Sequence, residues 1–155
     1  ALAVQDGIHL PSAGARQRQG LRRVARVMRP ANDVLASQIT VAQALQQVRS
    51  SALQSWLVVG RRGADQRGVI GVVNRSTLER EVAEHSARQL AEIIQEQTFP
   101  HVHQDQGLDL ALERMGANQI DVLPVVSRAD VHQLEGIVTL RDVLDSYGVG
   151  QGGRG

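Results

Sequence analysis

"GIVTLRDVL", from Gly136 to Leu144, is the stretch that decides the fold, because it runs from a β-strand directly into a helix. Thr139 and Asp142 lie three residues apart at the junction, which is close to the spacing of a capping box. In that motif the Thr hydroxyl accepts a hydrogen bond from the first turn of the helix, and the acid favours the positive helix end. The apolar stripe of the predicted helix consists of Leu140, Val143, Leu144 and Tyr147.

The chain contains this pattern twice. "GVIGVVNRSTL" matches "LEGIVTLRDVL", with Asn74 at the position of Thr139, 65 residues later. "TVAQALQQV" (40–48) matches "GLDLALERM" (107–115) 67 residues later. The segments 40–48 and 107–115 have apolar residues at i, i+3, i+4 and i+7, as an amphipathic helix does. The segments that follow them, "SWLVVG" and "VLPVVS", are short β-branched runs between turn formers and are typical of strands. Each copy therefore predicts the order strand, helix, strand, strand, helix.

Each copy has about 60 residues, which is near the lower limit for folding alone. Two copies packed sheet against sheet would give each one a buried face. We therefore predict the fold class α/β (α+β), with two β-α-β-β-α units packed as a pseudo-twofold pair. The predicted boundaries are a basic linker over 1–26, a first unit over 27–86, a second unit over 87–149 and a flexible tail over 150–155.

The composition predicts an aliphatic core and a body that does not bind nucleic acid. Aromatic residues make up 2% of the chain and cysteine is absent, so neither disulfides nor a Cys-based zinc site can form. No apolar run approaches the ~20 residues that cross a bilayer. All 17 basic residues are Arg, and six of them fall within residues 1–30, opposed only by Asp6. The basic charge therefore belongs to the N-terminal arm and not to the body.

The unit order, the "LPVV" strand and the Gly-hydrophobic-hydrophobic-Thr-x-x-Asp pattern resemble the cystathionine-β-synthase (CBS) domain, and the tandem resembles a Bateman module over roughly Val27 to Val149. A narrower resemblance rests on "ALAVQDGIHLPS", the Arg-rich stretch, "FPHVHQDQGLDLALERMG" and the ending "DVLDSYGV". These segments are similar to the cytoplasmic tail of bacterial CLC-type chloride channels and transporters.

That resemblance implies a regulatory module on the cytoplasmic side of the cell membrane. It implies that the module forms a homodimer. It also implies a second partner, the membrane-embedded channel domain of the same polypeptide, with this chain beginning just after the last membrane helix. The Arg-rich arm would then lie at the membrane face and meet anionic lipid, or would be a solvated linker. We expect the arm to be mobile through about Gly20, because it lacks apolar periodicity. Apolar stripes around Leu45 and Leu112 are the expected dimer surfaces.

Thr139 and Asp142 have two interpretations. Helix capping explains both residues, at ~1 kcal/mol for the cap. Alternatively, the free N–H groups of the helix start bind phosphate, and the resemblance implies that the Thr faces phosphate while the Asp holds ribose. Arg141 could add charge for the phosphate. The first copy has Asn74 and Thr77 at the matching positions, so it keeps the cap and loses the carboxylate, and at most one site has the full pattern.

The resemblance also implies that this motif faces the first strand and the entry of the second strand in the other copy. Trp56 either stacks on the base or lies in the core, and Leu57 stands where Pro124 stands in the second copy. ATP, ADP or AMP is the candidate regulatory ligand, and no cofactor is required. The predicted nucleotide-binding residues are Val34, Leu35, Ala36, Gln54, Ser55, Trp56, Thr139, Arg141 and Asp142.

Catalytic and metal sites are not predicted. His101 and His103 share a strand face, but no Cys or acidic cluster accompanies them, so we expect these rings to line the second cleft. The sequence has neither a Walker loop nor a spaced G-x-G-x-x-G after the first strand, and its serines lack partnered His and Asp residues in a known order. We predict a protein that is not an enzyme. Two alternatives are a ligand-free structural dimerisation module and the regulatory CBS pair of a metabolic enzyme.

Overall fold

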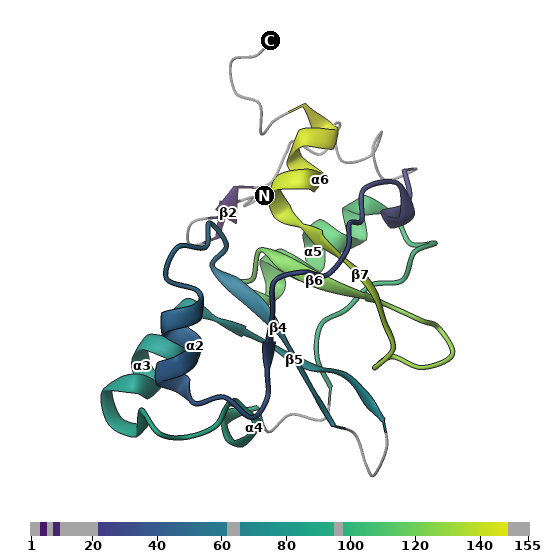
Figure 1. Ribbon diagram of the computed structural model, residues 1–155. Helices are drawn as coiled ribbons and strands as arrows, with labels where there is room; N and C mark the ends of the chain where they lie inside the picture. The colour runs from purple at the N-terminus through teal and green to yellow at the C-terminus, as the bar shows by residue number, and fades with distance from the viewer. Residues whose placement is uncertain (1–3, 6–7, 10–21, 62–65, 95–97, 149–155) are drawn as a thin grey trace.

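The computed structural model describes residues 4–5, 8–9, 22–61, 66–94 and 98–148 (Figure 1). The predicted tail over 150–155 and most of the predicted mobile arm lie outside these residues. In chain order the elements are β1 (Val4–Gln5), β2 (Ile8–His9), the 3-10 helix η1 (Val24–Arg26), β3 (Val34–Ala36), α2 (Val41–Gln47), β4 (Ser55–Arg61), β5 (Arg67–Asn74), α3 (Arg75–His85), α4 (Leu90–Ile93), α5 (Leu108–Asn118), β6 (Val122–Val126), β7 (Leu134–Thr139) and α6 (Leu140–Tyr147).

Two units with the same strand and helix order form the body. In the first, β3 pairs parallel with β4 and β4 pairs antiparallel with β5. In the second, β6 pairs antiparallel with β7. The counterpart of β3 in this unit is a single parallel bridge between Val102 and Val125. Figure 1 shows α2 and α3 at one end of the molecule and α5 and α6 at the other, with the strands between them. The predicted α+β fold is confirmed.

Side-chain caps start three of the helices. Thr40 and Gln43 form a reciprocal capping box at the start of α2. The side chain of Asn74 accepts a hydrogen bond from the first turn of α3, and that of Thr139 does the same in α6. At its other end α6 stops at Gly148, whose φ of 81° favours glycine. These local contacts explain why the two copies begin their last helices at matching positions.

Three buried clusters form the core, one in each unit and one between the two sheets. The central cluster joins the units, because it draws on both sheets. It consists of Leu57, Val69, Phe99, Val122, Val126 and Ile137. Leu112 is fully buried in the cluster of the second unit, and Leu45 is half-buried against that of the first. The expectation that the stripe around Leu112 offers a dimer surface is therefore wrong at Leu112 itself, since that side chain is used by the core.

The segments that precede the two units are exchanged between them. Val24 is buried in the cluster of the second unit, and its N–H donates to the carbonyl of Gln106 at 2.7 Å. Leu90 is buried in the cluster of the first unit, and its N–H donates to the carbonyl of Ile39 at 2.9 Å. Each unit thus includes residues that lie before the other unit in sequence. The predicted boundaries follow the order of the copies along the chain and remain a prediction as domain limits.

None of the helices in the described part of the chain has the length and hydropathy of a membrane span.

Candidate functional site

Each strand-to-helix junction opens into a cavity shared by both units. The cavity at the β7–α6 junction has a volume of about 570 Å³, and we call it the Asp142 cleft. The cavity at the β5–α3 junction has a volume of about 440 Å³, and we call it the Thr77 cleft. The Asp142 cleft is lined by Arg29, Pro30, Asn32, Asp33, Gln47, Ser50, Ser51, Ala52, Leu53, Ile137, Thr139, Arg141 and Asp142.

Asp142 and Thr139 are positioned at the start of α6. Thr139 is buried, and its hydroxyl accepts a hydrogen bond from the main-chain N–H of Asp142 at 3.1 Å. The Asp142 side chain is 18% exposed and pairs with Arg29 through both carboxylate oxygens. Nη2 of Arg29 lies 2.8 Å from Oδ1, and its Nε lies 2.7 Å from Oδ2. The capping contact uses the main chain of Asp142, so its carboxylate takes no part in the cap.

The main chain of Arg29 is held against β7. Its N–H donates to the carbonyl of Ile137 at 2.9 Å, and its carbonyl accepts from the N–H of Ile137 at 2.8 Å. A Cβ on Gly136 would lie 2.8 Å from the Arg29 carbonyl oxygen, so only glycine allows this approach. Sequence reasoning missed Arg29, because it counted this residue among the basic arm, 113 residues from Asp142.

The structure brings three of the nine predicted residues together in this cleft: Thr139, Arg141 and Asp142. The remaining six, Val34, Leu35, Ala36, Gln54, Ser55 and Trp56, are not among the residues that line it. The first unit instead contributes residues just before the predicted ones, since the lining includes 32–33 and 50–53. Within β3 and β4 the central side chains turn into their own core, and Leu35 and Trp56 are each 1% exposed.

Trp56 has the contacts of a core residue. Its indole N–H donates to the Ser51 hydroxyl at 3.1 Å. The guanidinium of Arg75 lies 4.9 Å from the ring centroid, at the distance of a cation–π contact. These neighbours favour the core interpretation of Trp56 over stacking on a ligand base.

Gln54 and Ser55 instead bind Asp121, which links the two units. Oδ2 of Asp121 accepts from the main-chain N–H of Gln54 at 2.9 Å, and Oδ1 accepts from the buried Ser55 hydroxyl. The N–H of Asp121 in turn donates to that hydroxyl at 2.9 Å, and its carbonyl accepts from the N–H of Leu140 at 2.9 Å. Asp121 therefore anchors the start of α6 to the first unit. Sequence reasoning did not identify this residue.

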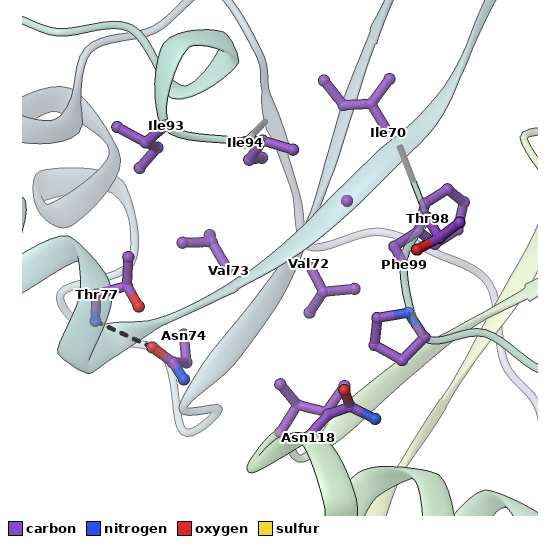
Figure 2. A pocket seen from close by; sticks show the side chains of 13 residues that line it. Ile70, Val72, Val73, Asn74, Thr77, Ile93, Ile94, Thr98, Phe99 and Asn118 are labelled. Atoms are coloured by element: carbon purple, nitrogen blue, oxygen red, sulfur yellow. Dashed lines mark hydrogen bonds between the residues drawn. The ribbon is translucent and has the colours of Figure 1, made fainter. Parts of the chain in front are cut away.

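The Thr77 cleft has the same helix cap as the Asp142 cleft, but its described lining residues are uncharged. Figure 2 shows Asn74 and Thr77 at one end of the cleft and Phe99 toward the other. The side-chain oxygen of Asn74 accepts from the Thr77 N–H at 3.0 Å, so the cap matches that at Thr139. None of the described residues that line this cleft carries a charge. They are Ile70, Gly71, Val72, Val73, Asn74, Thr77, Ile93, Ile94, Thr98, Phe99, Pro100, Asn118 and Ile120.

His101 and His103 each have a ring nitrogen within hydrogen-bond distance of a main-chain carbonyl. Nδ1 of His101 lies 2.9 Å from the carbonyl of Phe99, and Nδ1 of His103 lies 2.9 Å from that of Val126. Neither ring is among the residues that line the Thr77 cleft, although His101 lines a neighbouring cavity with Arg114. Over the described part of the chain, no group of three or more His, Cys, Asp or Glu residues could hold a metal ion.

Comparison with known proteins agrees with this architecture. The family model of the CBS domain matches residues 88–148. Solved CBS-domain structures cover 83–88% of the chain, which is more than the second unit alone. The chain has the fold of a CBS-domain pair. No curated protein matches it.

Three solved structures illustrate the likeness. The CBS domain of the bacterial CNNM/CorC family Mg²⁺ transporter in complex with ATP is 20% identical, covers 88% of this chain and 94% of its own, and has a TM-score of 0.64. The CBS domain pair of protein MJ0100, in complex with 5-methylthioadenosine and S-adenosyl-L-methionine, is 19% identical, with coverages of 83% and 97% and a TM-score of 0.63. A hemolysin-like protein containing a CBS domain from Oenococcus oeni PSU is 17% identical, with coverages of 85% and 94% and a TM-score of 0.64. At these identities the likeness establishes the CBS-pair fold and does not confirm the narrower resemblance to CLC-type tails.

Proposed function

We propose that this CBS pair is a regulatory module that binds an adenine nucleotide, ATP, ADP or AMP, in the Asp142 cleft. The observation that carries the proposal is the convergence of Thr139, Arg141 and Asp142 on one cavity of about 570 Å³. Ligand sites for small molecules typically have volumes of about 300–1,000 Å³, so a mononucleotide is of suitable size. The Thr77 cleft offers a similar volume without a carboxylate or a cation among its described lining residues.

Each group has a definite task in this proposal. The Asp142 carboxylate accepts hydrogen bonds from the two ribose hydroxyls, as a two-oxygen acceptor can. The phosphate lies near Thr139 at the start of α6 and meets the guanidinium of Arg141. The apolar lining residues Pro30 and Ile137 provide a surface for the base. Related folds support this ligand class, because the ATP, methylthioadenosine and S-adenosylmethionine of the solved structures share an adenosine group.

We further propose that the module regulates a CLC-type chloride channel or transporter. In this proposal it is not an enzyme, it forms a homodimer, and it lies on the cytoplasmic side of the membrane, joined to the channel domain of the same polypeptide. Support comes from the N-terminal and C-terminal segments that are similar to CLC tails. A nucleotide would bias transport by binding two states of the channel with different affinity. The protein sequence encoded upstream of Ala1 tests this context: apolar helices support the channel, and a catalytic domain supports a metabolic enzyme.

A second candidate is a structural dimerisation module without a ligand. The pairing of Asp142 with Arg29 favours it, because this ion pair and the helix cap together give both motif residues a structural role.

Calorimetric titration with ATP, ADP and AMP separates the two candidates. Hydrogen bonds to a charged group contribute roughly 1.5–3 kcal/mol, so Asp142→Ala is expected to weaken binding on the order of 10- to 100-fold. Asp142→Asn should cost less, since it keeps one acceptor. Asp109→Ala, which removes an exposed acid from the first turn of α5, is the matched control and should bind as wild type does. No binding by wild type at millimolar nucleotide would leave the structural module as the remaining candidate.

A further inference from the structure

Arg29 contacts both carboxylate oxygens of Asp142, the same two atoms that the proposed ribose contact uses. Its Nη2 donates a hydrogen bond to Oδ1 at 2.8 Å, and its Nε lies 2.7 Å from Oδ2 as an ion-pair contact, so the guanidinium faces both carboxylate oxygens. The vicinal hydroxyls of a ribose present the same pattern of two neighbouring donors. A ligand that binds Asp142 through its ribose therefore competes with the Arg29 guanidinium.

Only the side chain of Arg29 is free to yield. Its main chain is fixed by the paired hydrogen bonds with Ile137, while its side chain is 58% exposed. Pairs between exposed side chains contribute roughly 0.2–1 kcal/mol, and the exposed Arg29 guanidinium can enter water when it leaves Asp142. Displacing the guanidinium from Asp142 therefore costs little free energy. Because the main chain of Arg29 is fixed, the released guanidinium stays beside the same cavity, which Arg141 also lines.

The charges around the cleft indicate where the released guanidinium goes. With Arg29 paired to Asp142, the remaining charged lining residues are Arg141 and Asp33, which balance each other. When ribose hydroxyls replace Arg29 at Asp142, the cleft gains a guanidinium without a partner. A phosphate accepts two parallel N–H bonds from such a group, whereas an uncharged nucleoside leaves it to water.

We propose that Arg29 is the specificity-determining residue of the Asp142 cleft: a phosphorylated nucleoside displaces it from Asp142 and binds it through phosphate, so the cleft selects nucleotides over uncharged nucleosides. This inference rests on the proposed function, since it assumes that ribose binds at Asp142. It assigns to the ligand a phosphate that contacts two arginines, Arg29 and Arg141.

Calorimetric titration of the full chain with AMP and with adenosine tests this role. Arg29→Gln should weaken AMP binding by about 2- to 100-fold, because the loss of a charge-assisted phosphate contact exceeds the gain from an ion pair that no longer has to be broken. The same variant should bind adenosine about 1.4- to 5-fold more tightly, because no ion pair has to be broken. Arg29→Lys keeps the charge without the planar fork, so its AMP affinity should lie between those of wild type and Arg29→Gln. Arg26→Gln is the matched control, because Arg26 is exposed on η1 and does not line the cleft.

The outcomes separate this inference from the proposed function. If Arg29→Gln weakens the binding of AMP and of adenosine equally, Arg29 only orients Asp142. If the affinities for both ligands stay unchanged, the ion pair is incidental. Either result overturns this inference and leaves the proposed function standing. Wild type that binds neither ligand overturns the proposed function and this inference with it. Melting temperatures of the variants, expected within a few degrees of wild type because the Arg29 side chain is exposed, show that the fold is retained.

Discussion

The contact between Asp121 and the first unit predicts a large loss of stability in Asp121→Ala. The substitution leaves the hydroxyl of Ser55, which is 0% exposed, without its acceptor and removes the acceptor of the Gln54 N–H. Gln54 is exposed, so water replaces its partner, whereas the buried hydroxyl loses a charge-assisted bond. A hydrogen bond to a charged group contributes roughly 1.5–3 kcal/mol. We therefore expect the free energy of unfolding to fall by about 2–3 kcal/mol.

Urea denaturation and thermal melting measure this effect. For a chain of this size, 1 kcal/mol shifts the melting temperature by about 2–4 °C, so the expected shift is about 4–12 °C. Glu113→Ala removes an exposed carboxylate from α5 and should change stability by less than about 0.5 kcal/mol. Ser55→Ala and the double variant complete a double-mutant cycle, whose coupling energy should be about 1–2 kcal/mol. A cost for Asp121→Ala no larger than that for Glu113→Ala would refute the view that this contact joins the units.

Three further predictions concern the approach of Arg29 to β7, the second cleft and the assembly. Gly136→Ala should destabilise the protein by about 1–3 kcal/mol in denaturant titrations, because the new Cβ meets the Arg29 carbonyl. Gly71→Ala should reduce stability less, since its Cβ meets only the Ile94 side chain, which can rotate. Equal losses of stability in the two variants would contradict this reasoning. Thr77→Ala should leave AMP affinity within about 2-fold of wild type in calorimetry, because no carboxylate is lost, and a 10-fold loss would indicate that the Thr77 cleft binds the nucleotide. Sedimentation at high concentration should show a species heavier than the 16.8 kDa monomer, and a monomer at every concentration would count against the proposed homodimer.

The fold was predictable from the sequence because its determinants are local. The helix starts at Thr40, Asn74 and Thr139 are set by contacts to residues three positions on. The caps at Asn74 and Thr139 recur at matching positions of the two copies, whereas Gly107, which matches Thr40, has no side-chain cap. The spacing of apolar residues likewise identified the helices that pack on each sheet. Neither determinant requires knowledge of which distant segments meet.

The cleft was only partly predictable because half of it depends on distant segments. Its second-unit wall follows from the Thr-x-x-Asp motif at residues 139–142, but Arg29 reaches this wall only because the leading segments of the two units are exchanged. The first-unit wall could not be read from periodicity either. In β4 the residues from Ser55 to Val58 are all buried, so no alternation of apolar and polar side chains marks the face toward the cleft.

The two clefts separate the requirements of folding from those of binding. The Asn74 cap starts α3 with Thr77 at the third helical position, so a carboxylate there is not needed to begin the helix. At the other junction the cap uses the hydroxyl of Thr139 and the main chain of Asp142, and every contact described for the Asp142 side chain is with Arg29. The guanidinium of Arg29 is 58% exposed, so it can leave the pair for water. The carboxylate of Asp142 is therefore not needed to start α6, and its two oxygens are available to a ligand that displaces the Arg29 guanidinium.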